Sequence, residues 1–207
     1  SDKLSKILRL DGIFSLLDRN KKVKAQISNP NHLYYSHWTS DSSCYELDRY
    51  FSIMISMGCN GVCPYCVVGN TQGNEKHNAI NYSFDLVKTV LNNELPYHDP
   101  QAVKLFFASG ESNILSTIQN FNNMGLNVRV GSLNVKQLQL DLLYQLIMNG
   151  QNEVTIAPET VQPLRKSIGK GYFTDELLFE KIELVSKQKM NLTLYYLCGL
   201  VEEHKLS

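Results

Sequence analysis

The amino-acid sequence predicts an α/β fold built on a parallel sheet, either open or curved into a partial barrel. From Tyr50 onward, short β-rich runs alternate with amphipathic helical runs. A repeated strand, helix, strand series favours right-handed crossovers between parallel strands. The chemically distinctive motifs follow the ends of the β-rich runs, which is where α/β folds bind their ligands.

Hydrophobic periodicity and helix-end residues define the expected elements. The expected strands are 51–57, 103–108, 127–131, 153–157 and 192–197, and the expected helices are 84–92, 112–123, 136–148 and 174–188. Gly125 and Gly150 follow helical runs, where a left-handed C-cap is favoured. Asp175 and Glu176 fall in a first helical turn, which favours negative charge. Because the sequence ends soon after the fifth expected strand, we expect a barrel truncated at that point.

Two parts of the chain differ in character. Residues 1–49 combine an amphipathic helix over 3–18 with a polar lead-in that has no core of its own. Residues 50–207 carry the alternating pattern and are expected to form the core domain.

Composition narrows the class of protein. The 207 residues are 43% hydrophobic and 19% charged, with 20 basic and 20 acidic side chains, as expected of one soluble globular domain. Zero net charge removes the general attraction for phosphate that a dedicated nucleic-acid binder shows. No apolar run is long enough to cross a bilayer and no signal peptide opens the sequence, so we expect a cytoplasmic protein without a membrane partner.

The loop after the first expected strand carries three of the five cysteines in a CxxxCxxC pattern, Cys59, Cys63 and Cys66. Three thiolates in one compact loop suit an iron–sulfur cluster, with one iron left open for a substrate or cofactor. Cys63-Pro64-Tyr65-Cys66 alone is also the dithiol pattern of glutaredoxins. Zinc would need a fourth, distant ligand such as Cys44 or His77. Cys198, in an apolar run, is read as a small core residue.

The cysteine loop and several later segments together resemble the radical S-adenosylmethionine (SAM) superfamily. Within it, the segments are similar to those of cobalamin-associated members and tRNA methylthiotransferases. They are the cysteine loop with Tyr65 before its last cysteine, Ala108-Ser109-Gly110-Glu111, Gly131-Ser132-Leu133, Ile156-Ala157-Pro158-Glu159-Thr160, Leu164-Arg165, Gly169-Lys170-Gly171, and Tyr196-Leu197-Cys198-Gly199-Leu200. The resemblance implies a partial (β/α) barrel of the radical SAM type.

The resemblance also implies the cofactors and the site. A 4Fe–4S cluster on the three cysteines would reductively cleave SAM to a 5′-deoxyadenosyl radical, which activates a substrate that the sequence does not identify. The residues that would contact SAM are Tyr65, Ser109, Gly110, Glu111, Ser132, Glu159 and Arg165. Glu111 would accept from the amino group of SAM, and Arg165 would meet its carboxylate. No further catalytic residue is assigned.

Partners and alternatives follow from the same reading. The cluster would need an electron donor such as a flavodoxin or ferredoxin, and tRNA is one conceivable substrate. The runner-up within the family is a tRNA methylthiotransferase. A glutaredoxin-like dithiol oxidoreductase is the alternative from another class. A noncatalytic degenerate core also stays open, because Ser109 replaces the first glycine of the family's GGE motif and Val201 follows the fifth strand where Pro is usual.

Overall fold

The structure is a computed structural model that describes residues 50–61, 63–68, 79–97, 102–107, 113–200 and 203. The expected N-terminal helix and lead-in over 1–49 lie outside these residues. The strands are β1 (Tyr50–Met54), β2 (Ser56–Met57), β3 (Ile80–Asn81), β4 (Ala102–Phe106), β5 (Val128–Val130), β6 (Ser132–Leu133), β7 (Glu153–Glu159) and β8 (Asn191–Tyr196). The α-helices are α3 (Phe84–Glu94), α4 (Ile114–Asn123), α5 (Leu140–Met148), α6 (Gln162–Arg165) and α7 (Asp175–Lys187), with 3-10 turns η1 (Leu95–Tyr97) and η2 (Val135–Gln137).

The parallel strands follow one another across the structure in chain order. One sheet has the order β1-β4-β5 and another the order β6-β7-β8, with every pairing in both parallel. Only Gly131 separates β5 from β6, so the third strand pairs with β4 through its first half and with β7 through its second. The predicted α/β class with parallel strands is confirmed, and no closed barrel forms among the described residues. The sequential order lacks the strand-order reversal of a doubly wound sheet.

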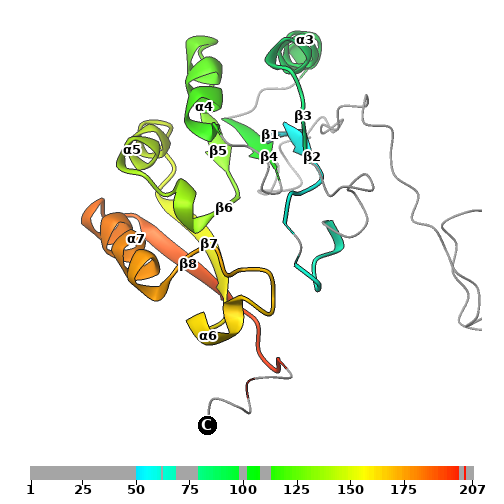
Figure 1. Ribbon diagram of the computed structural model, residues 1–207. Coiled ribbons are helices and arrows are strands. Elements are labelled where there is room, and N and C mark those ends of the chain that lie inside the picture. Colours follow the sequence, from blue (N-terminus) through cyan, green and yellow to red (C-terminus); the bar gives the residue numbers. More distant parts are fainter. Residues whose placement is uncertain are drawn as a thin grey trace, which may run out of the picture.

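Helices α4, α5 and α7 lie on one side of these strands (Figure 1). Alternate strand residues such as Phe51, Ile53, Val103 and Leu105 are buried, and they belong to the same apolar core as residues of α3, α4, α5 and α7. The residues between them lie on the opposite face, which we call the inner face. The segment that carries the cysteines, cyan to teal in Figure 1, lies on the side away from the helices.

The helix ends follow the predicted local chemistry, with one exception. Ser83 and Thr174 cap α3 and α7 by accepting from backbone N–H groups, and Gly125 and Gly150 take the left-handed conformation expected of them, with φ of 78° and 76°. The expected helix 136–148 is instead two elements, η2 and α5. Asn134 and Gln137 close a capping box around η2, and the backbone is extended before α5 begins.

None of the helices that the structure describes has both the length and the apolar character needed to cross a bilayer.

Candidate functional site

The three cysteines of the loop line one cavity at the carboxyl ends of the parallel strands. The cavity has a volume of about 530 Å³ and is lined by Cys59, Cys63, Cys66 and by residues of other strand-end loops. Those residues are Asn134 after β6, Glu159 at the end of β7, and Gly169, Lys170 and Tyr172 between α6 and α7. The cavity is in the size range of small-molecule and cofactor sites. Its place matches the expectation for parallel α/β folds.

Short hydrogen bonds hold the cysteine loop in shape. The Gly61 N–H donates to Cys59 Sγ at 3.2 Å, and the Cys66 N–H donates to the Cys63 carbonyl oxygen at 3.1 Å. The Cys63 thiol points across the cavity to the Gly169 carbonyl oxygen, at 3.9 Å. Hydrogen bonds to sulfur stabilise thiolates and tune cluster potentials, so the loop suits thiolate ligands.

The arrangement of the thiols bears on which metal group they could hold. Among the described residues, no three His, Cys, Asp or Glu side chains converge on one point as a single metal ion requires. In a 4Fe–4S cluster each thiolate binds a different iron, so the thiols surround a volume rather than a point. Cys59, Cys63 and Cys66 form no disulfide and all line the same cavity, which fits the second arrangement. The proposed distant zinc ligands, Cys44 and His77, lie outside the described residues.

Gly61 lies so close to the sulfur of Cys59 that a larger residue would displace that sulfur. A Cβ atom at Gly61 would lie 3.2 Å from Cys59 Sγ and 3.8 Å from Cys63 Sγ. We expect Gly61→Ala to lower the iron bound per chain after anaerobic reconstitution while leaving the urea midpoint near that of the wild type. Gly131→Ala is the matched control, because a Cβ there meets no atom within 4 Å. Equal iron content in both variants would contradict this role for Gly61.

Glu159 occupies a constrained position at the rim of the cavity. It ends β7 in the left-handed conformation, with φ of 67°, beside an irregularity in the pairing with β8. Its side chain is 13% exposed, and its carboxylate lies 3.7 Å from Lys170 Nζ, which also donates to the Ala157 carbonyl oxygen at 3.3 Å. Non-glycine residues in this conformation are uncommon outside turns and functional sites, and the strain turns the carboxylate into the cavity.

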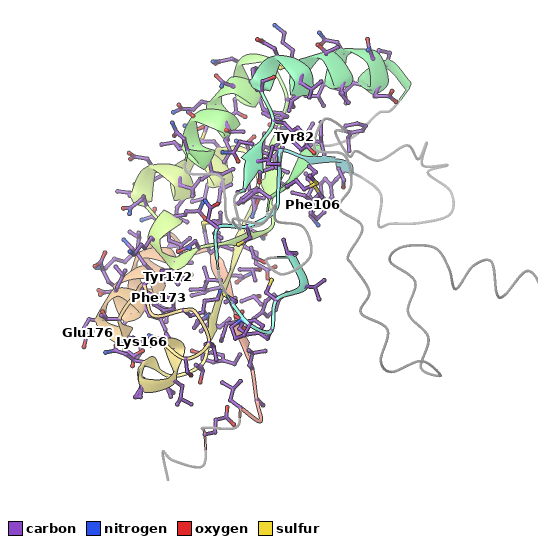
Figure 2. All side chains as sticks on the ribbon, turned by 45° about the vertical axis from the view of Figure 1, so that its right-hand side comes forward. Tyr82, Phe106, Lys166, Tyr172, Phe173 and Glu176 are labelled. Carbon is purple, nitrogen blue, oxygen red and sulfur yellow. The ribbon has the colours of Figure 1, made fainter. Side chains whose placement is uncertain are left out.

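Two tyrosines present neutral hydroxyls to the thiols and to Glu159. Burial, together with the nearby Cys63 thiol and Glu159 carboxylate, raises the pKa of Tyr65 far above its usual value. Burial and then Cys63 raise the pKa of Tyr172 to about 12, partly offset by a hydrogen bond from Asn134. Tyr172 packs edge to face on Phe173, with ring centroids 5.0 Å apart (Figure 2). Both hydroxyls therefore remain protonated donors at neutral pH.

Two of the residues expected to bind SAM do not line this cavity. Arg165 is buried, with 2% of its side chain exposed; its Nε donates to the Thr160 carbonyl oxygen and its guanidinium pairs with Asp175 and covers the Phe173 ring at 4.4 Å. Its contacts are those of a structural residue. Ser132 lies on the inner face and lines a different cavity. The segment Ser109, Gly110 and Glu111 lies outside the described residues.

Other positions differ from expectation or were missed. Cys198 follows β8 and is exposed, so it is not the core residue that its apolar surroundings suggested. The sequence assigned no role in the site to Asn134 or Tyr172, and Lys170 entered the sequence analysis only as part of a family segment. Asn134 carries a usable signal, because it is the first polar residue after a strand end and caps the following turn. Tyr172 carries none in the sequence.

A scan against protein-family models finds no match to the chain, and a search of curated proteins finds no significant match either.

Proposed function

We propose that the chain is the core of a radical SAM enzyme that binds a 4Fe–4S cluster through Cys59, Cys63 and Cys66 and binds SAM beside it. The observation that carries the proposal is that all three thiols of the CxxxCxxC loop line one cavity at the carboxyl edge of a parallel sheet. Three thiolates leave one iron open for SAM. The proposal includes a partial (β/α) barrel of the radical SAM type, an electron donor such as a flavodoxin or ferredoxin, and an unidentified substrate.

The surrounding side chains have chemistry suited to SAM. A bound cluster would supply the single electron that reductive cleavage of SAM requires. Glu159 offers a partly buried carboxylate to an ammonium or to ribose hydroxyls, in competition with Lys170 at 3.7 Å. Tyr65 and Tyr172 offer neutral hydroxyl donors and aromatic surface, because burial raises the pKa of both. A tRNA methylthiotransferase remains the runner-up within this reading.

A glutaredoxin-like dithiol is the second candidate. It is favoured by the turn in which the Cys66 N–H donates to the Cys63 carbonyl oxygen, because the two cysteines of that turn line the same cavity. This function would need neither iron nor Cys59. A noncatalytic core would bind the cluster without cleaving SAM.

Anaerobic reconstitution with iron and sulfide, followed by electron paramagnetic resonance of the reduced protein, tests the proposal. We expect a signal of a reduced 4Fe–4S cluster that changes when SAM is added, and methionine among the products. A cluster whose signal changes but that releases no methionine would indicate the noncatalytic core. A chain that takes up no iron and instead cycles between dithiol and disulfide would overturn the proposal.

A further inference from the structure

A second cavity lies on the inner face of the sheet, closer to the amino ends of the strands. It has a volume of about 410 Å³, and its polar lining includes Lys104 on β4, Arg129 on β5, Ser132 on β6, and Thr155 on β7. These are the strand positions that alternate with the buried core residues. Inner-face positions of small parallel barrels are usually filled by apolar side chains, so the presence of two cationic side chains at such positions requires an explanation.

Lys104 and Arg129 are direct neighbours on adjacent parallel strands. They occupy paired positions in the register of β4 and β5. Like charges on neighbouring strands repel each other, which disfavours this pair unless an anion lies between them.

Neither cation is neutralised by the protein in the part that the structure describes. No Asp or Glu oxygen lies within 4.0 Å of either side chain among the described residues, and each instead faces an aromatic ring. Lys104 Nζ lies 5.4 Å from the Phe106 ring centroid, and the Arg129 guanidinium carbon lies 5.9 Å from that of Tyr50. Arg129 Nε is also buried without a hydrogen-bond partner.

The lining also includes one carboxylate. Glu153 begins β7, and its Oε1 accepts from the Thr193 hydroxyl at 2.6 Å while the carboxylate keeps its negative charge. The cavity therefore combines two cations with one carboxylate and with hydroxyl donors, a lining of net positive charge that matches an anion with several oxygens.

We propose that this inner-face cavity binds the phosphoryl group of a small organic molecule through Lys104 and Arg129. A phosphoryl group carries up to two negative charges on three terminal oxygens, enough to meet both cations and a hydroxyl of Ser132 or Thr155. A carboxylate has two oxygens and one charge, so it would leave one cation unmatched. The volume of about 410 Å³ suits a small molecule rather than a length of RNA.

The position of the cavity also suggests how such a molecule would lie. Thr155 lines this cavity and Glu159 lines the cysteine-lined cavity, and the two residues are four positions apart on β7, at most about 13 Å along a strand. A ligand held at its phosphoryl end by Lys104 and Arg129 would extend toward the cysteine-lined cavity. The identification of this ligand as the substrate depends on the proposed function. The existence of the binding site does not depend on it.

Phosphate binding by the full chain without a cluster tests the site independently of the radical chemistry. Inorganic phosphate is titrated at constant ionic strength and followed by amide chemical shifts around β4 and β5, with acetate as the carboxylate probe. We expect saturable shifts with phosphate, weaker ones with acetate, and at least a tenfold loss of phosphate affinity in Arg129→Gln and in Lys104→Met. Lys187→Met, which removes an equal charge from exposed α7, is the control.

Three results would overturn this site. They are unchanged phosphate affinity in both variants with native-like spectra, an equal loss in Lys187→Met, and tighter binding of acetate than of phosphate. Competition by a single-stranded RNA far more effective than inorganic phosphate would overturn the small-molecule assignment. Because the chain carries no cluster in these titrations, a negative result here leaves the cluster experiment unaffected, and the reverse also holds.

Discussion

Cys59→Ser is expected to abolish cluster assembly as completely as Cys63→Ser or Cys66→Ser. Each variant removes one of three thiolates from the same cavity, and a serine hydroxyl is a poor replacement for a thiolate on iron. After anaerobic reconstitution, iron and sulfide per chain should fall to background in all three variants, and the signal of the reduced cluster should disappear. The measurement is iron and sulfide analysis together with electron paramagnetic resonance.

Cys198→Ser is the matched control for this series. It is the same chemical change at a free, exposed cysteine that does not line the cavity, so its iron content should equal that of the wild type. The series also separates the two candidate functions. If Cys59→Ser behaves like the control while only the Cys63 and Cys66 variants lose a redox activity, the dithiol function replaces the cluster.

The parallel sheet and the location of the site were predictable from the sequence because both depend on local pattern. Strands appear close to the five expected positions because alternating burial and flanking turn residues are encoded within each run, although the expected strand 51–57 is divided into β1 and β2. The position of the cysteine loop follows from topology, since all parallel strands end at one edge. The break before α5 was not predicted, because the apolar spacing continues through Leu138 while the backbone becomes extended at Leu138 and Gln139.

The side-chain roles in the site were less predictable, because they depend on face and on distant partners. Ser132 follows a strand end in the sequence, yet its place on β6 turns it toward the inner-face cavity rather than toward the cysteines. A shift of one residue along a strand exchanges the two faces, so a motif alone does not determine this. The sequence did not predict a site at Lys104 and Arg129, because the two side chains become neighbours only through the pairing of β4 with β5.

Arg165 is the clearest case of a distant partner deciding a role. The motif around it suggested a contact with SAM. In the structure its guanidinium instead forms an ion pair with Asp175, ten residues later at the start of α7. The Arg165 side chain is almost entirely buried, and its Nη1 has no hydrogen-bond partner, so its charge depends on the few contacts that remain. Those contacts join α6, the loop before it and α7 into one unit.

Asp175→Asn is therefore expected to destabilise the fold strongly, although Asp175 itself is 40% exposed. The variant leaves the buried Arg165 charge without its counter-ion. Removing one partner of a fully buried ion pair costs about 3 kcal/mol or more, and the partial exposure of Asp175 reduces this cost. Urea unfolding should show a markedly lower midpoint. Glu176→Gln, which removes one acid from the same helical turn, should move the midpoint far less, because Glu176 is exposed and pairs with no buried charge among the described residues.

The same two variants decide where Arg165 acts. If Arg165 held the carboxylate of SAM, Asp175→Asn would leave the urea midpoint nearly unchanged and alter only the SAM-dependent change in the spectrum of the reduced cluster. If Arg165 is structural, the midpoint falls, and the folded fraction that remains still loads iron on Cys59, Cys63 and Cys66. A stable variant with an altered SAM response would return Arg165 to the cofactor site and would show that the pair with Asp175 is not what holds α6 against α7.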